Sequence, residues 1–511
     1  MPLLMAVRGR GGVRSHRPIK LVALAGRRRR EAPKPGTRRR TAMNLTPKLF
    51  RSYASKNIRD PRLRQTYRMA TSHALEHRLR AVREVPEWEA LRERAHRIKE
   101  EAINHLDQYL EKLEGKVVAN GGKVFWARDG REASDYIIST AQRIKARTVV
   151  KSKSMTTEEI GLSHTLEKHG LETVETDLGE YIIQLAKEMP SHITAPALHM
   201  TRGQIGRLFS RKLGIDYTDV PEELCAFARK RLRQKFLAAE LGISGVNFAL
   251  ADTGTIVIVE NEGNARLSTT MPRVHMAVMG LEKVIPKFSD LPIFLKLLPR
   301  SSTGQKQTSY VSFISSPRKS GEMDGPEEFH LVLLDNGRSE ILADPRMRES
   351  LFCIRCGACL NTCPIYQRVG GHSYGSVYSG PIGAVITPLL QGVEVAKDLP
   401  YASSLCGACS NICPVKIDIH HQLLWLRQRV VEAKGTSWQE RLMMKLYLAG
   451  MKDSTLYRFG SGLLRTALLI AGRRFQPLKV PGWTETRDFP PLAEKSFKQL
   501  WKEMEGEENR Q

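Results

Sequence analysis

Apolar residues recur at three- and four-residue steps in the first part of the chain, with charged residues between them. The clearest run comprises Leu91, Ala95, Ile98, Ala102, Leu106, Tyr109 and Leu113. This spacing places one apolar stripe along a helix whose opposite face is charged. We therefore predict a helical region over residues 44–120, ending where Gly115, Gly121 and Gly122 interrupt the pattern.

Between residues 121 and 338 the pattern changes to short apolar runs separated by helical periodicity. We predict strands at 123–127, 148–150 and 171–176, and helices at 131–145 and 157–169. This βαβαβ order is typical of a doubly wound, mainly parallel α/β sheet. Strand-like runs at 245–251, 255–260 and 331–334 are expected to extend the same sheet, with helices at about 202–241.

Residues 339–432 hold seven of the eight cysteines in two short runs. The runs are Cys353-x2-Cys356-x2-Cys359-x3-Cys363-Pro364 and Cys406-x2-Cys409-x3-Cys413-Pro414. This spacing is typical of a module with two iron–sulfur clusters. In such a module the last cysteine of each run ligates the cluster that is held mainly by the other run. We assign Cys353, Cys356, Cys359 and Cys413 to cluster 1, and Cys363, Cys406 and Cys409 to cluster 2.

Two other uses of clustered cysteines explain these runs less well. Zinc takes four ligands from two separated pairs, which leaves the further thiolates and the proline after each run without a reason. Disulfides are disfavoured because clustered thiols without an export signal indicate a reducing compartment, so we expect a cytoplasmic protein.

The second run lacks one ligand, because Ser403 stands where a cysteine is expected. Three thiolates fit a 3Fe-4S cluster, or a 4Fe-4S cluster whose last iron takes Ser403, water or a ligand from a partner. The eighth cysteine, Cys225, lies in a helical pattern, where a small apolar thiol is most often part of the core. Residues 433–511 are expected to be helical and then to contain several prolines.

The net charge of +26 is unevenly distributed. Residues 1–42 contribute +12, which leaves +14 for the rest of the chain. We expect a disordered basic extension over residues 1–43, because its Pro, Gly and Arg runs cannot form a core. Met43 directly precedes the first structured pattern, so this extension is interpreted as lying upstream of the true start, with an organellar transit peptide as the alternative.

The remaining positive charge does not indicate a nucleic-acid-binding protein. Aromatic residues make up only 7% of the chain, and basic residues alternate with acidic ones as on a solvated helix face. No apolar stretch is long enough for a transmembrane helix. We expect neither nucleic acid nor a membrane span.

A second candidate site lies in the α/β region. Lys153 follows a predicted strand at a helix start, and Asp252 and Glu262 flank another strand. Ligands of doubly wound sheets bind beyond the carboxyl ends of the strands, where helix N-termini favour anions. Lys153, Asp252 and Glu262 therefore define a candidate anion pocket. The alternative, that these are turn and capping residues, stays open.

From about Asn44 to its end, the sequence resembles the lactate utilisation protein B family. The matching stretches are Val150–Met155, Glu172–Tyr181, Ala251–Gly254, Asp324–His330, Asp335–Arg338, Gly370–Gly375, Tyr378–Ala384 and both cysteine runs. The resemblance implies a LUD-type domain of the NagB/RpiA/CoA-transferase-like α/β class, an α-helical ferredoxin domain and a family-specific C-terminal segment. It also implies that Ser403 is normal for the family.

The same resemblance implies a role in oxidising L-lactate to pyruvate, with two companion subunits, one of them rich in cysteine, and a downstream electron acceptor. We expect an electron-transfer subunit, because clusters pass electrons singly and no flavin or nicotinamide motif is present. The alternative is a self-contained hydroxy-acid oxidoreductase with catalysis in the α/β pocket. His372, Tyr374 and Tyr378 are candidates for cluster-neighbouring donors, a docking surface or turn residues.

Overall fold

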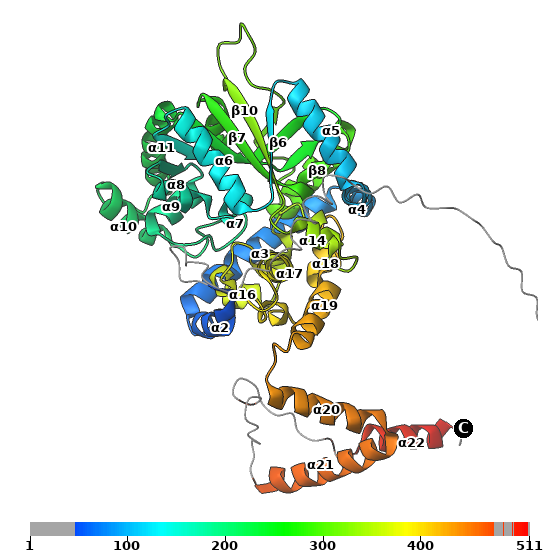
Figure 1. Cartoon of the computed structure of the whole chain (residues 1–511). Coiled ribbons are helices and arrows are strands. Elements are labelled where there is room, and N and C mark those ends of the chain that lie inside the picture. Colours follow the sequence, from blue (N-terminus) through cyan, green and yellow to red (C-terminus); the bar gives the residue numbers. More distant parts are fainter. Residues whose placement is uncertain (1–45, 475–483, 485–492, 494, 509–511) are drawn as a thin grey trace, which may run out of the picture. The chain divides into compact units, whose positions relative to one another are not determined.

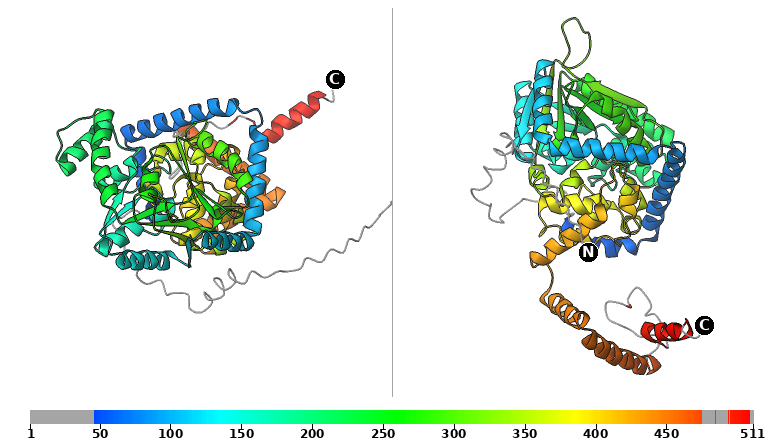
Figure 2. Two further views of the ribbon diagram at one scale, coloured as in Figure 1. Left: turned by 90° about the horizontal axis from the view of Figure 1, so that it is seen from above. Right: turned by 90° about the vertical axis from the view of Figure 1, so that its right-hand side faces the viewer.

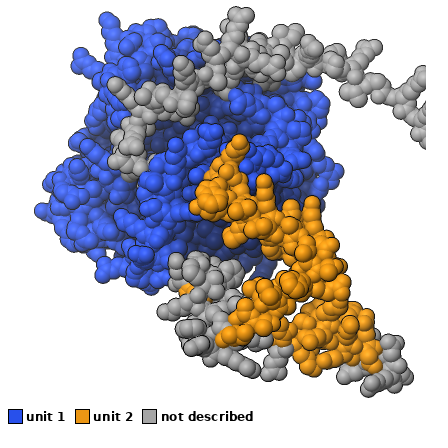
Figure 3. All heavy atoms as spheres, turned by 60° about the horizontal axis from the view of Figure 1, so that its bottom comes forward, with its two compact units in different colours: residues 1–433 blue, residues 434–511 orange. Residues whose placement is uncertain are grey.

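The computed structural model describes residues 46–474, 484, 493 and 495–508. These residues form two compact units that divide after Ala433, drawn in different colours in Figure 3. The expected disordered extension at residues 1–43 lies outside the described residues. Within the described part of the chain, no helix is both long and apolar enough to cross a membrane.

A six-stranded parallel sheet forms the centre of the first unit (Figure 1). Its strands lie in the order β1 (Lys123–Ala127), β10 (Glu328–Leu334), β7 (Val274–Gly280), β4 (Leu241–Gly245), β2 (Thr148–Lys151) and β3 (Glu172–Glu175). All five pairings between neighbours run parallel. The predicted mainly parallel α/β arrangement is therefore confirmed.

Helices cover both faces of this sheet. They are α6 (Gly130–Arg143) and α8 (Leu162–Lys168) on one face, and α9 (Leu178–Ala186), α10 (Arg202–Leu213) and α11 (Pro221–Ala238) on the other. Successive strand residues point to opposite faces, so Val149 packs with α6 and α8 whereas Val150 packs with α10 and α11.

The runs at 245–251 and 255–260 do not extend the main sheet, and that prediction is wrong. They belong largely to a second, four-stranded sheet, in the order β8 (Val284–Ile285), β5 (Phe248–Leu250), β6 (Thr255–Glu260) and β9 (Tyr310–Ile314). The chain leaves β4 at Gly245, and Asn247 then bonds to β6 through its backbone N–H and its side-chain oxygen. These bonds turn the following residues into the second sheet.

The predicted helix at 157–169 is two helices, α7 (Met155–Glu159) and α8. Gly161 separates them with a φ of 63°, which glycine adopts without strain. The N-terminal region is likewise divided, into α2 (Phe50–Ile58), α3 (Pro61–Arg83), α4 (Trp88–Asn104) and α5 (Leu106–Ala119), preceded by η2 (Pro47–Leu49). The apolar stripe thus continues across a break at His105.

The N-terminal helices run along the outside of the first unit (Figure 2). One apolar core joins them to the second sheet and to the cysteine region, with Leu106, Leu250, Phe294 and Leu360 among its fully buried members. Because this core is shared, the cysteine runs lie on the same packed body as the α/β sheets.

Short helices make up the rest of the first unit. They are α12 (Asn264–Thr270), η3 (Leu281–Lys283), η4 (Phe288–Asp290), α13 (Leu291–Ser302), α14 (Arg338–Leu342), η5 (Arg348–Phe352), α15 (Ala358–Thr362), α16 (Tyr366–Val369), η6 (Gly371–Tyr374), α17 (Gly380–Gln391), η7 (Leu399–Tyr401), α18 (Ala408–Ile412) and α19 (Ile419–Glu432). The insert between the cysteine runs is therefore helical, as the resemblance to a family with an α-helical ferredoxin domain implies. The second unit contains α20 (Trp438–Lys452), α21 (Ser454–Arg474) and α22 (Phe497–Glu508).

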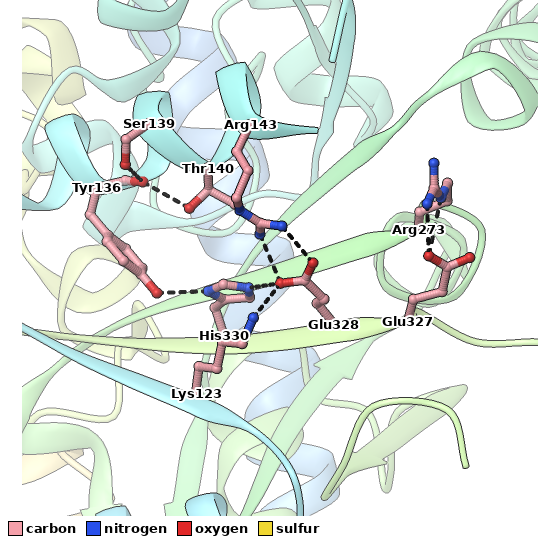
Figure 4. A network of polar contacts seen from close by, with 9 residues as sticks. All are labelled: Lys123, Tyr136, Ser139, Thr140, Arg143, Arg273, Glu327, Glu328 and His330. Atoms are coloured by element: carbon pink, nitrogen blue, oxygen red, sulfur yellow. Dashed lines mark hydrogen bonds and ion pairs between the residues drawn. The ribbon is translucent and has the colours of Figure 1, made fainter. Parts of the chain in front are cut away.

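A polar cluster joins edge strand β1 to β10 at their amino ends (Figure 4). Glu328 accepts hydrogen bonds from Lys123, Arg143 and His330, and His330 also contacts the Tyr136 hydroxyl at 2.8 Å. The hydrogen bonds from Arg143, outweighing a partial burial that would raise it, lower the pKa of Glu328. The carboxyl edge of the sheet is free of this cluster and faces the cysteine region.

Candidate metal centre

The two cysteine runs fold into the same turn. Arg355 and Leu405 precede matching cysteines and both have left-handed backbone, with φ of 60° and 56°. Gly357 and Gly407 follow these cysteines at φ of 77° and 76°, and a short helix, α15 or α18, begins after each. A side chain is disfavoured at such angles, so each turn needs glycine after the cysteine. Left-handed non-glycine residues are uncommon and concentrate at functional sites.

Four of the cysteines surround one small cavity. Cys353, Cys356 and Cys359 of the first run line it together with Cys413 of the second run. Cys356, Cys359 and Cys413 are each only 7–8% exposed. The structure thus brings together the four residues that the crossing pattern assigns to cluster 1.

The other three cysteines form a second group. Burial, together with the nearby thiols of Cys363 and Cys406, raises the pKa of Cys409 to about 11. Cys406 is exposed, whereas Cys363 and Cys409 are buried. The first group is therefore enclosed, and the second reaches the protein surface at Cys406.

The surroundings of both groups fit iron–sulfur clusters. Burial raises the pKa of Cys413 to about 12 and that of Cys356 further, so these thiols ionise readily only when bound metal stabilises the thiolate. The buried Tyr374 hydroxyl has no hydrogen-bond partner among the described residues and lies near the thiols of Cys363 and Cys359. Cluster sulfurs accept such donors, and a buried hydroxyl without a partner is otherwise unfavourable.

Ser403 occupies the place of a ligand in the second turn. The Arg355 backbone N–H donates to Cys353 Sγ at 3.4 Å, and the Leu405 N–H donates to Ser403 Oγ at 3.1 Å. The serine oxygen therefore replaces the cysteine sulfur in an equivalent backbone contact. Cys225 lies apart from both groups, half-buried on α11.

Cationic side chains surround the first group. Arg78 donates to the Ile412 carbonyl at 3.2 Å, and Arg92 donates through Nε to the Cys413 carbonyl at 3.0 Å. Lys99 is buried, and this burial lowers its pKa to about 7. Positive charge at these positions, on Arg78 and Arg92 and, below about pH 7, on Lys99, favours thiolates and an anionic cluster.

A buried ionic network connects the sheet to this group. Arg338 contacts Glu282 at 2.6 Å and forms two parallel bonds to Glu159 at 2.8 and 2.9 Å. Glu282 also contacts Arg355 at 3.3 Å, and the Arg355 guanidinium lies 4.6 Å from the centre of the Tyr378 ring. Tyr378 in turn donates to Glu159 at 2.6 Å. Tyr378 is therefore part of this network rather than a surface residue.

A cavity of about 290 Å³ lies at the carboxyl edge of the main sheet. Lys153 and Glu262 line it, as the sequence predicts for an anion pocket. Asp252 does not lie among its lining residues, and its carboxylate instead accepts from the Phe288 backbone N–H. Lys283 and Arg355 also line this cavity and were not predicted. Arg355 belongs to the first cysteine turn, so the cavity reaches from the sheet to that turn.

His372 lies at a contact between the helical insert and the α/β region. Its Nε2 atom contacts the Met189 carbonyl at 2.7 Å, and its ring packs edge-on against His199. A ring nitrogen of His372, a ring nitrogen of His199 and a carboxylate oxygen of Glu188 all lie within 4.8 Å of one another, and these three atoms could hold a metal ion. These contacts make His372 a structural link between the two regions.

Comparison with family profiles divides the chain into three parts. Residues 110–334 match the LUD domain, residues 349–417 match a 4Fe-4S dicluster domain, and residues 427–506 match the description "Lactate utilisation protein B, C-terminal". The dicluster match includes all seven clustered cysteines. It supports an iron–sulfur cofactor in this region.

Curated relatives match over most of the chain. "Lactate utilization protein B" from Bacillus cytotoxicus is 47% identical over 469 residues, which is 90% of this chain and 98% of that protein. The protein of the same name from Bacillus thuringiensis is 46% identical over the same shares. A crystal structure of a DUF162 family protein from Deinococcus radiodurans covers 45% of this chain and 98% of its own, at 11% identity and a TM-score of 0.26. That likeness is too weak to support an inference.

Proposed function

Because the chain belongs to the lactate utilization protein B family, we propose that it is the iron–sulfur electron-transfer subunit of a multi-protein system that oxidises L-lactate to pyruvate. One observation carries this proposal: the seven cysteines gather into an enclosed group and a group that opens to the surface. Two clusters so placed suit a relay between the interior and a partner.

The protein's own residues hold the two ends of this relay. Cys353, Cys356, Cys359 and Cys413 would hold cluster 1, and Cys363, Cys406 and Cys409 would hold cluster 2, with Ser403 Oγ at its fourth position. When bound, such clusters take up and release one electron at a time. The exposed Cys406 brings the second group within reach of a docked acceptor.

The division of the chain follows the same proposal. Residues 121–338 form a LUD-type domain of the NagB/RpiA/CoA-transferase-like class, and residues 339–432 form the ferredoxin domain. Residues 44–120 support both of these domains. Residues 433–511 contribute to assembly of the complex. Large apolar side chains on α20 and α21 are exposed, including Leu446, Phe459 and Leu463 at 66%, 74% and 66%. Exposed apolar surface of this kind supports docking of a companion subunit in the cytoplasm.

A self-contained hydroxy-acid oxidoreductase is the second candidate, because the cavity beside β2 and β4 reaches the first cysteine turn. The two functions separate in one assay on the isolated, anaerobically purified chain. We expect iron and sulfide in both groups, and no oxidation of L-lactate when a redox dye is the acceptor. Turnover of lactate by the isolated chain would favour the self-contained enzyme.

Ligand substitution tests the relay itself. Cys413→Ala should damage cluster 1 although it lies in the second run, and Cys363→Ala should damage cluster 2. EPR of the reduced protein distinguishes the two losses. Cys225→Ala is the matched control, because Cys225 lies apart from both groups, and it should retain the parental iron content and spectrum. Stoichiometric zinc without sulfide would refute the iron–sulfur assignment.

A further inference from the structure

The cavity at the carboxyl edge of the main sheet has two chemically different ends. Asp177, Glu260 and Glu262 line it near β3 and β6, and Lys283 and Arg355 line it near β7 and the first cysteine turn. Lys153 also lines it, after β2. The ligand that fits depends on which of these charged groups already have partners.

The acidic groups are occupied by backbone donors. Glu260 accepts from the N–H groups of Ala265 and Arg266, both at 2.7 Å. Asp177 caps α9 by accepting from the Glu180 N–H, and Glu262 accepts from the Leu178 N–H at 3.3 Å. These carboxylates shape one wall and do not neutralise the opposite end.

The cationic groups have donors to spare. The Arg355 side chain is 10% exposed, and its NH1 atom is buried without a hydrogen-bond partner in the described part of the chain. Its NH2 atom shares Glu282 with Arg338. Lys283 is 8% exposed, and no residue that the structure describes gives its Nζ atom a hydrogen bond or ion pair. A buried guanidinium nitrogen without a partner is unfavourable unless a ligand accepts from it.

We propose that Lys283 and Arg355 bind the carboxylate of a small 2-hydroxy or 2-oxo acid in this cavity, beside the first cysteine group. That the ligand is a 2-hydroxy or 2-oxo acid rests on the proposed function, whereas that it carries a carboxylate follows from the positive charges of Lys283 and Arg355. Guanidinium and ammonium groups bind carboxylates through charge-assisted bonds, which are about twice as strong as neutral ones. Ser154, Asn247 and Asn264 line the same cavity and can bond to an oxygen on carbon 2.

The position agrees with the topology of the sheet. The lining residues follow β2, β3, β4 and β7, and parallel sheets bind ligands beyond the carboxyl ends of their strands. The inference concerns binding alone and assigns no bond-breaking step to the cavity.

Isothermal titration of the cluster-loaded full chain at constant ionic strength tests the inference. L-Lactate and pyruvate are compared with propionate, which lacks the oxygen on carbon 2, and with 1,2-propanediol, which lacks the carboxylate. We expect both acids to bind, propionate to bind more weakly and propanediol not to bind. Lys283→Met should weaken lactate binding at least about tenfold, as expected for losing a bond to a charged group.

Lys287→Met is the matched control, because Lys287 is exposed on the same segment and does not line the cavity. It should bind lactate like the parent. Lys283→Gln keeps the test open if Lys283→Met fails to retain iron, because it also removes the charge while it keeps a polar side chain, and it should also weaken binding. Equal affinity in Lys283→Met and Lys287→Met, binding of propanediol, or no binding by the parent would overturn the proposal.

The two proposals fail separately. If lactate does not bind while the clusters still pass electrons, only the carboxylate site is refuted. If lactate binds in the predicted order while the clusters are absent or inactive, the site stands and the electron-transfer function falls. A lower reduction potential in Lys283→Met with unchanged lactate affinity would show that Lys283 serves the cluster alone, which also refutes the site.

Discussion

Arg338 is the buried side chain on which the ionic network depends. It is 2% exposed and contacts both Glu159 and Glu282, which are 6% and 1% exposed. Burial alone would raise the pKa of Glu282, but the guanidinium groups of Arg338 and Arg355 outweigh burial and lower it to about 2. Both carboxylates are therefore ionised in the folded protein and depend on Arg338 for compensation.

Arg338→Met keeps an unbranched side chain and removes the charge. Breaking a buried ion pair by removing one partner destabilises a protein by about 3–5 kcal/mol, because the remaining charge is left uncompensated. Glu159 keeps Asn336 and Tyr378 as donors, and Glu282 keeps Arg355. These remaining bonds place the expected loss near the lower limit, about 3 kcal/mol.

Urea unfolding of the first unit, followed by circular dichroism, measures this loss. The double variant Glu159→Gln/Arg338→Met should recover at least about 1 kcal/mol of it, because one unpaired charge is gone. Arg131→Met is the control: Arg131 is 89% exposed and lies 3.7 Å from Asp135, so a change below about 0.5 kcal/mol is expected. A loss below about 1 kcal/mol in Arg338→Met would refute the reasoning.

Three further predictions concern single groups. Burial and the nearby Glu158 raise the pKa of Glu180 from 4.5 to about 8, so the folded state holds a proton that the unfolded chain releases, and stability falls as pH rises between these values. The free energy of unfolding of Glu180→Gln, measured with urea, should therefore be about 1–3 kcal/mol higher than that of the parent at pH 8 but not at pH 5. An equal difference at both pH values would contradict this. Tyr374→Phe should keep the iron content and lower a cluster's reduction potential in an EPR-monitored titration, because a donor to its sulfurs is lost; an unchanged potential would exclude that contact. Ser403→Cys should make cluster 2 more resistant to oxygen, as followed by its absorbance in air; an identical decay would mean that another ligand already closes the site.

The sequence predicted the elements whose periodicity is uninterrupted. Strands β1, β2 and β3 and helix α6 lie where the short apolar runs and the helical periodicity place them. Strand β7 was missed: it contains few β-branched residues, and its second residue, His275, looks polar although it pairs with Ser244 at 2.8 Å. Such a strand is recognised from its neighbours in the sheet, β4 and β10, which a single sequence does not reveal.

The candidate site divides in the same way. The cysteine spacing predicted which thiols lie together, because ligand geometry is local to each turn apart from one crossing residue in each run. Lys283 and Arg355 were not predicted as partners, because one follows the missed strand β7 and the other lies between two cysteines. Asp252 was included in the candidate anion pocket because it flanks a predicted strand. Its carboxylate instead accepts a hydrogen bond from the Phe288 backbone N–H. Strand ends predict an anion site only when the order of strands in the sheet is known.

The two cysteine turns repeat one backbone design in different electrostatic surroundings. Arg355 in the first turn corresponds to Leu405 in the second, and Cys353 corresponds to Ser403. The first group is enclosed among Arg78, Arg92 and Lys99, which favour added negative charge, whereas the second is open to water at Cys406. In the relay that we propose, clusters bound in these unequal surroundings would have unequal reduction potentials, and this inequality would give the relay its direction. The cations thus add an electrostatic difference to the one that Ser403 already makes between the two cysteine runs.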